Sequence, residues 1–198
     1  MAEDSEMCSC FARSLERRTA LKMALGLVVG FNFVHVAAAQ DDARSARPRA
    51  GDLFTFAEGV EEGRVIAPGD LAQGGPQVMA FPLDPRTRLV RDGSRLNKLL
   101  LVRLDPAGLD EETRGHAADG IVAYSAICTH QGCDVMAWDA ELQSFWCPCH
   151  DSKFDPRDGG RVVTGPAPRR LPALPVKIAD GVLMAAGGFS AHVGPKTR

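Results

Sequence analysis

The chain has 198 residues, of which 45% are hydrophobic and 24% are charged, and its formal net charge is −2. These values are ordinary for a globular protein with a packed core, and they give no electrostatic reason to expect nucleic acid or an anionic membrane surface as a partner. Four of the six cysteines lie in two short segments, which argues against a disulfide framework spread over the chain.

Residues 1–39 have the pattern of an export signal. The pair Arg17 and Arg18 precedes an apolar run that begins at Met23 and ends in three alanines at residues 37–39. This order is typical of a twin-arginine signal with a cleavage site, although Ala20 stands where the usual pattern has phenylalanine. We therefore expect a periplasmic protein. The alternative is that the segment is retained as a short membrane anchor, and only then do we expect membrane contact.

The rest of the chain predicts strands and turns. Residues 40–51 are polar and rich in arginine, which indicates a linker before a domain at 52–198. We expect strands at 52–56, 77–81, 98–104 and 120–127, a turn of helix within 107–118, and a hairpin at 176–185 closed by Asp180 and Gly181. Short strands separated by many turns predict an all-β sandwich or barrel.

Two segments carry the residues that can bind metal. The first, "CTHQGC", runs from Cys128 to Cys133, and the second, "CPCHDS", runs from Cys147 to Ser152. Cys128 and His130 are two residues apart, so in an extended loop both side chains leave on the same side. Either Cys147 or Cys149 could act together with His150.

Two cysteines with two histidines fit more than one metal centre. They could hold a tetrahedral zinc ion, or a [2Fe-2S] cluster in which two histidines replace two cysteines on one iron. Either choice leaves two thiols unused. In an exported protein, thiols that face each other from adjacent loops are expected to form a disulfide.

The two segments, with thirteen residues between them, resemble the cluster-binding signature of the high-potential Rieske iron–sulfur proteins. The resemblance implies a Rieske-type antiparallel β sandwich with a small cluster-binding subdomain at about residues 120–168, holding one [2Fe-2S] cluster per chain. It implies that Cys128 and Cys147 bind one iron, that His130 and His150 bind the other, and that Cys133 and Cys149 form a disulfide.

The same resemblance assigns roles to residues near the cluster. It implies that the Ser152 hydroxyl donates to a bridging sulfide and that "GPAP", Gly165 to Pro168 with Pro166 in it, forms a third wall. Gly132 is expected to leave room where its loop passes close to the sulfurs. We expect Trp138 and Trp146 to be buried in a hairpin between the two segments, and His116 and His192 to be solvated.

The sequence also departs from the Rieske pattern. Phe154 stands where quinol-oxidising subunits usually carry a tyrosine, and Asp151 occupies a place that is commonly glycine. Phe154 and "DGIVAYSAICTH", which ends at His130, are closer to the small subunit of arsenite oxidase, whereas "GPAP" is closer to the cytochrome bc-type subunit.

These features predict an exported electron-transfer subunit of a periplasmic oxidoreductase, rather than a stand-alone enzyme. Its expected partners are a larger catalytic subunit, as in arsenite oxidase, and a cytochrome-type acceptor. The alternative is the quinol-oxidising Rieske subunit of a cytochrome bc complex. A zinc-stabilised binding module is the alternative of another class. A Rieske ferredoxin of an aromatic-ring dioxygenase is disfavoured, because such ferredoxins lack the two extra cysteines and an export signal.

Overall fold

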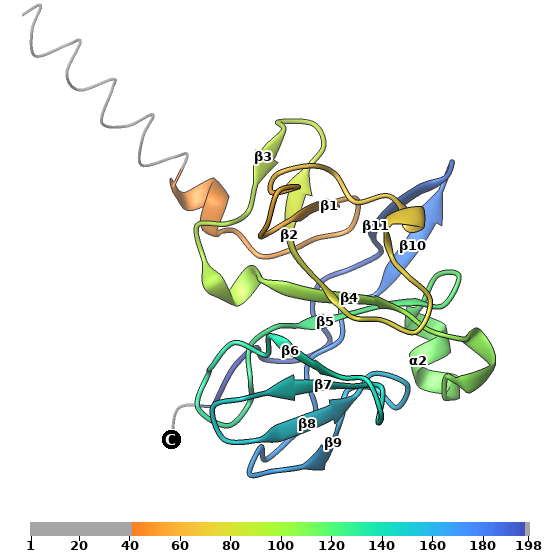
Figure 1. Cartoon of the computed structure of the whole chain (residues 1–198). Helices are drawn as coiled ribbons and strands as arrows, with labels where there is room; N and C mark the ends of the chain where they lie inside the picture. Colours follow the sequence, from red (N-terminus) through yellow and green to blue (C-terminus); the bar gives the residue numbers. More distant parts are fainter. Residues whose placement is uncertain (1–40, 197–198) are drawn as a thin grey trace, which may run out of the picture. The chain divides into compact units, whose positions relative to one another are not determined.

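A computed structural model describes residues 41–196 (Figure 1). The predicted export signal lies outside the described residues. Residues from Ala43 onward form one compact unit. Within the described part of the chain, no helix is both long enough and apolar enough to cross a membrane.

A large antiparallel sheet forms the base of this unit. It contains β1 (Leu53–Phe56), β2 (Val78–Asp84), β4 (Leu99–Arg103) and β5 (Ile121–Ser125) in that order, and β3 (Leu89–Val90) pairs with β2. The strands expected at 52–56, 77–81, 98–104 and 120–127 are all present. Between β4 and β5 lies α2 (Glu111–His116), which begins where the Asp110 carboxylate accepts the Thr113 N–H at 2.7 Å. Three short 3-10 helices, Pro68–Asp70, Arg95–Asn97 and Pro106–Gly108, complete the connections.

Two smaller sheets pack against the large one. The hairpin of β10 (Val176–Ala179) and β11 (Val182–Ala185) turns at Asp180 and Gly181, whose φ angles of 51° and 76° suit a two-residue turn. The second small sheet contains β6 (Ala137–Asp139), β7 (Ser144–Cys147), β8 (Ser152–Asp155) and β9 (Arg161–Thr164) in sequence order (Figure 1). All pairings are antiparallel. The all-β prediction is confirmed.

Strand β4 supplies both hydrophobic cores, because successive side chains of a strand point to opposite faces. Leu100 and Val102 join the core that contains Phe145 and Phe154 of the β6–β9 sheet. Residues 99 and 101 join the other core, with side chains from β1, β10 and β11. A strand covered on both faces accounts for the unbroken apolar run at its centre.

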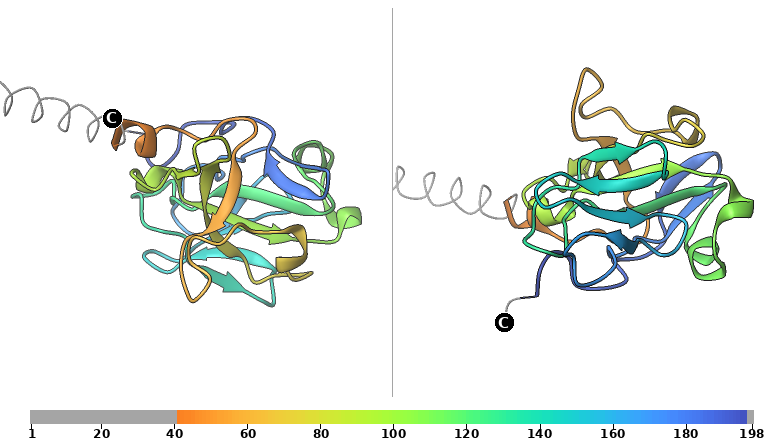
Figure 2. Two further views of the ribbon diagram at one scale, coloured as in Figure 1. Left: turned by 90° about the horizontal axis from the view of Figure 1, so that it is seen from above. Right: turned by 60° about the horizontal axis from the view of Figure 1, so that its bottom comes forward.

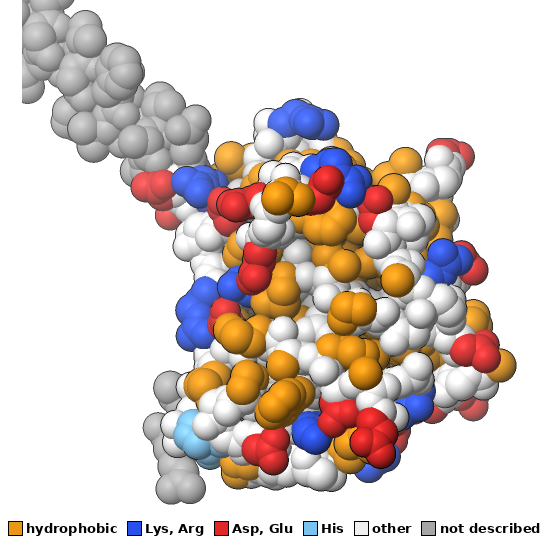
Figure 3. Space-filling view, viewed as in Figure 1, with side chains coloured by type: hydrophobic (Ala, Val, Ile, Leu, Met, Phe, Trp, Pro, Cys, Tyr) orange, Lys and Arg blue, Asp and Glu red, His pale blue; other side chains and the backbone are white. Residues whose placement is uncertain are grey.

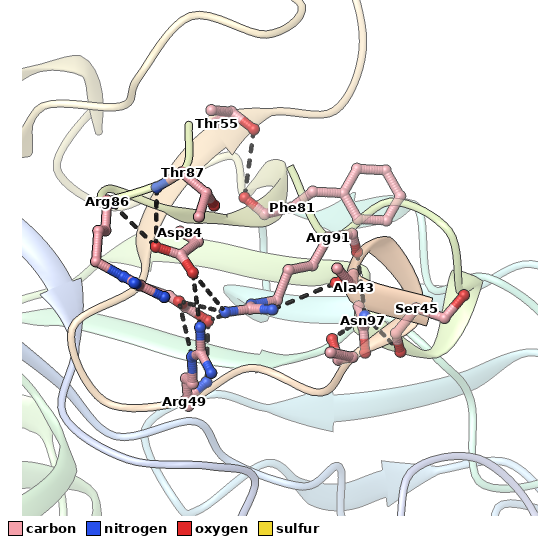
Figure 4. A network of polar contacts seen from close by, with 12 residues as sticks. Ala43, Ser45, Arg49, Thr55, Phe81, Asp84, Arg86, Thr87, Arg91 and Asn97 are labelled. Atoms are coloured by element: carbon pink, nitrogen blue, oxygen red, sulfur yellow. Dashed lines mark hydrogen bonds and ion pairs between the residues drawn. The ribbon is translucent and has the colours of Figure 1, made fainter. Parts of the chain in front are cut away.

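The polar segment before β1 is attached to the large sheet (Figure 4). The Arg91 guanidinium donates to both carboxylate oxygens of Asp52 at 2.7 and 3.1 Å, and Arg49 donates to Asp84 at 2.6 Å. The Asn97 amide donates to the carbonyl of Ala46 at 2.9 Å. Arg91 and Asp52 are almost fully buried, so each removes the cost of burying the other's charge. The large sheet thus holds the chain from residue 43 onward.

Candidate metal centre

The two cysteine–histidine segments form adjacent loops on the β6–β9 side of the molecule. The first loop, residues 128–133, follows β5 and closes on itself, since the Cys128 N–H donates to the Cys133 carbonyl at 2.8 Å and Gly132 N–H donates back to the Cys128 carbonyl at 3.0 Å. The second loop connects Cys147, the last residue of β7, to Ser152, the first residue of β8. We call them the first and second loops.

Backbone conformation explains one of the departures from the Rieske pattern. Asp151 has a φ of 58°, in the left-handed region that favours glycine. Aspartate is among the few other residues that adopt this region with moderate strain. The positive φ of this position accounts for the glycine that is common there, and aspartate can also adopt it.

A disulfide joins Cys133 in the first loop to Cys149 in the second, with Cα atoms 6.6 Å apart. Cys128 and Cys147 are free thiols, and both are buried. The sulfur atoms of Cys133, Cys147 and Cys149 lie within 4.8 Å of one another. Two of these three sulfurs are bonded to each other, so Cys128 and Cys147 are the thiols that remain able to bind metal.

The two histidines lie face to edge. The ring centroids of His130 and His150 are 4.6 Å apart, and the ring planes are perpendicular. His150 is exposed, whereas His130 is half-buried and its Nδ1 atom is buried with no hydrogen-bond partner. A buried polar atom without a partner costs about 1–3 kcal/mol, and a metal bound to the nitrogen lone pair would remove this cost.

The thiols also favour a cation. Burial first, and then the neighbouring Cys128 thiol, raise the pKa of Cys147 to about 11. Without a cation, the Cys147 thiol stays protonated at neutral pH. Bound iron supplies the positive charge that lets thiols ionise and coordinate. Two thiols and two imidazoles in adjacent loops fit a mixed-ligand [2Fe-2S] cluster, and by donor chemistry alone they also fit zinc.

The "GPAP" turn packs against the second loop. Gly165 has a φ of 89°, and a Cβ atom there would lie 2.5 Å from the Ser152 Cα atom, so only glycine allows this approach. The Ala167 N–H donates to the Ser152 hydroxyl oxygen at 3.2 Å. Ser152 is fully buried, and because its oxygen accepts from Ala167, its own hydrogen is available to donate elsewhere.

Strand pairing brings Phe154 into the same layer as Ser152. Cys147 is opposite Ser152, and Phe145 is opposite Phe154, so the four side chains share the inner face of the sheet. Phe154 is fully buried. Trp138 and Trp146 do lie in the expected hairpin, but each is only half-buried; Trp138 packs its ring 5.8 Å from Phe145.

Sequence reasoning missed two supports of the first loop. Arg95 donates to the Gly132 carbonyl and to Asp134, both at 2.6 Å, and Lys98 donates to Asp134 at 2.8 Å. Gly132 has a φ of 77°, and a Cβ atom there would lie 3.3 Å from Pro195 Cδ. Apart from its chain neighbours, the atoms nearest to this position belong to Pro195 of the C-terminal segment. A single sequence carries no signal that Gly132 contacts Arg95 or Pro195, which lie about 40 and about 60 positions away.

Comparisons with known proteins identify the domain. Residues 97–175 match the family described as the Rieske [2Fe-2S] domain. A cytochrome bc1 complex Rieske iron-sulfur subunit of Streptomyces lividans is 43% identical over 99 residues, which are 49% of this chain and 58% of that protein. A putative respiratory nitrate reductase subunit Rieske of Haloferax mediterranei is 38% identical over 122 residues, 61% of this chain and 52% of that protein. This chain therefore spans about half the length of these two relatives.

Among solved structures, the soluble domain of the Rieske protein II from Sulfolobus acidocaldarius matches 50% of this chain and 68% of its own chain, with 27% identity and a TM-score of 0.38. The match of residues 97–175 to the Rieske [2Fe-2S] domain supports a [2Fe-2S] cluster over the zinc-stabilised module. The comparisons do not support the narrower resemblance to the arsenite oxidase small subunit.

Proposed function

We propose that this protein is a Rieske electron carrier in which Cys128 and Cys147 bind one iron and His130 and His150 bind the other. The observation that carries the proposal is the donor set: two buried free thiols and two perpendicular imidazoles, in loops joined by the Cys133–Cys149 disulfide. Such a cluster accepts and releases single electrons. Neutral imidazoles in place of thiolates raise its reduction potential.

The exposure of the two histidines indicates where a redox partner contacts the carrier. His150 is exposed, and His130 borders a cleft of about 470 Å³ with Pro166 and Pro168. Since imidazole rings are the ligands nearest to solvent, a partner that contacts His150 has the shortest route to the cluster. The half-buried His130 leaves less surface for that contact.

The partner we favour is a quinol within a cytochrome bc-type complex. The similarity to the bc1 Rieske subunit and the "GPAP" turn support this assignment over our first expectation of an arsenite-oxidase-like subunit. In this role, the ring nitrogen of His150 that does not bind iron would first lose its own proton to solvent, and as an imidazolate nitrogen it would accept a hydrogen bond from the quinol hydroxyl. It then takes the hydroxyl proton as the electron leaves the quinol.

A second candidate is a subunit that passes electrons between a catalytic oxidoreductase subunit and a cytochrome. Phe154 favours it, because quinol-oxidising subunits usually carry tyrosine there, and so does the similarity to the putative nitrate reductase subunit. The exposed apolar side chain of Met136, at 60% and three residues after Cys133, suits contact with a partner in either complex. Figure 3 shows apolar side chains gathered across the face that carries β6 and β7.

Metal and sulfide analysis of the full-length protein tests the cluster. We expect two irons and two acid-labile sulfides per chain and an electron paramagnetic signal only after reduction. Cys128→Ala and His150→Ala should each abolish the signal. His116→Ala should keep it, because His116 lies in α2, outside the two loops. One zinc per chain in the wild-type protein would overturn the proposal.

Isolation of the native complex distinguishes the two roles. A bc-type subunit should co-purify with a cytochrome and support quinol-dependent cytochrome reduction. Co-purification with another oxidoreductase subunit and no quinol activity would favour the second candidate.

We also propose that the protein acts outside the cytoplasm after twin-arginine export. Changing Arg17 and Arg18 to lysine together should leave the cluster-loaded protein in the cytoplasm. Normal accumulation of that variant in the periplasm would rule this route out.

A further inference from the structure

The C-terminal segment of the described chain, residues 192–196, lies across the first loop. Val193 and Gly194 are buried, and a Cβ atom at Gly194 would lie 3.3 Å from Cγ2 of Ile127, the residue before Cys128. Pro195 lies against Gly132. Figure 2 shows this segment, at the blue end of the chain, at the same end of the molecule as the turn that follows β5. We call residues 192–196 the strap.

Arg169 attaches the strap to the "GPAP" turn, Gly165 to Pro168, which we also call the proline turn. Its guanidinium donates to the His192 carbonyl at 2.9 Å and also to the Gly194 carbonyl. A guanidinium presents several N–H groups in a fixed fork, so one side chain can hold two carbonyls of an otherwise irregular segment. His192 is exposed, as expected, and belongs to the strap, where its Nε2 atom lies 3.3 Å from the Pro195 carbonyl oxygen.

The backbone of Arg169 is tied to the first loop as well. The Thr129 hydroxyl donates to the Arg169 carbonyl at 2.6 Å, and Thr129 is 1% exposed. Thr129 lies between Cys128 and His130. Arg169 thus connects three segments. It directly follows the "GPAP" turn in the chain, its carbonyl accepts from the first loop, and its guanidinium donates to the strap.

We propose that Arg169 is a positioning residue that holds the strap over the first loop, making the strap a further wall of the cluster site. This inference rests on the proposed function for its redox consequences. The disulfide already limits how far the two loops separate at Cys133. The strap adds a second restraint on the first loop, because Pro195 contacts Gly132 and also borders the cleft beside His130.

The arrangement predicts non-additive effects. If Arg169 acts through the strap, Arg169→Met and a chain truncated after Ala191 remove the same restraint, and the combination is no worse than either alone. We expect each to speed loss of the cluster to an iron chelator about tenfold, equivalent to about 1.4 kcal/mol in the barrier. Arg170→Met is the matched control, because Arg170 is adjacent but its ion pair, at 3.3 Å, is with Glu112.

Amide hydrogen exchange measures the effect of the strap on the first loop in protein without the cluster. In cluster-free protein with the disulfide intact, the amide hydrogens of Cys128 and Gly132 should exchange faster in the truncated chain and in Arg169→Met, while those of β4 and β5 should not change. If wild-type protein holds no cluster, the proposed function fails, but this exchange experiment still tests the strap.

The midpoint potential of the cluster tests whether Arg169 positions the strap or only stabilises the fold. Two thiolates and two sulfides balance two ferric irons, so reduction adds a negative charge that water stabilises. Arg169→Lys keeps the positive charge but loses the fork, so its midpoint potential should shift upward as the loosened strap admits water to the site.

Two results would overturn the inference. One is that the effects of truncation and Arg169→Met on cluster loss multiply. The other is that neither variant changes cluster loss or amide exchange relative to Arg170→Met.

Discussion

Replacing Gly165 by alanine tests whether the proline turn presses on the second loop as the structure has it. The added Cβ atom would lie 2.5 Å from the Ser152 Cα atom and 2.6 Å from the Asp151 carbonyl oxygen. Carbon atoms in normal contact are about 3.5–4.0 Å apart, so the turn must move away by about 1 Å. Both neighbours are backbone atoms and cannot swing aside as a flexible side chain can.

The hairpin glycine Gly181 provides the matched control. Its φ of 76° is close to the 89° of Gly165, but no atom lies within 4 Å of the position of its Cβ atom. Alanine costs about 1–2 kcal/mol in this backbone region, and both variants bear that cost. Only Gly165→Ala adds the overlap and the loss of the Ala167–Ser152 hydrogen bond, which is worth about 1 kcal/mol.

We therefore expect Gly165→Ala to lower the free energy of unfolding by at least about 3 kcal/mol, and Gly181→Ala by about 1–2 kcal/mol. Denaturant unfolding of the cluster-free proteins measures both. In loaded protein, Gly165→Ala should also alter the electron paramagnetic spectrum, because the Ser152 hydroxyl moves. Equal destabilisation by the two substitutions, with an unchanged spectrum, would refute the contact between the turn and the second loop.

Three further predictions concern the loops and their sheet. Changing Cys133 and Cys149 to serine should permit cluster assembly at reduced yield with faster cluster loss, and complete absence of iron would mean that disulfide and ligand cysteines are wrongly assigned. Ser152→Ala should lower the midpoint potential by some tens of millivolts, since a difference of ~1 kcal/mol between oxidation states corresponds to roughly 40 mV for one electron. Phe154→Tyr should raise the midpoint potential only if the buried hydroxyl reaches a cysteine sulfur. Redox titrations in which both variants shift by less than about 10 mV would show that neither residue is near the cluster. The Leu142 N–H and the Lys153 ammonium hold the pKa of Asp139 below its usual range, so its contribution to stability is present above about pH 3.9 and is lost as the pH falls through the lower folded value. Urea unfolding between about pH 2 and pH 5 should accordingly show a weaker pH dependence for Asp139→Asn than for wild type.

Much of the fold could be predicted because its signals are local. The buried strand β4 is a continuous apolar run, and the Asp180–Gly181 turn needs only two residues with positive φ. The donor residues could likewise be found, because four of the six cysteines and two of the five histidines lie within two short segments. Spacing could not choose between Cys147 and Cys149; that choice needed either a family resemblance or the disulfide geometry.

The supports of the first loop could not be predicted, because their partners are distant in the sequence and chemically ordinary. Arg95 and Gly132 are 37 positions apart, and Arg169 and Gly194 are 25 apart. In both pairs the acceptor is a backbone carbonyl, which every residue has, so the identity of the acceptor residue carries no information. What the sequence does contain is the glycine at each acceptor: Gly132 and Gly194 both have a φ of 77°, and at both a Cβ atom would lie 3.3 Å from a side-chain atom of the other segment. Glycines of this kind in a loop or near a chain end indicate where two segments meet, even when the second segment cannot be named.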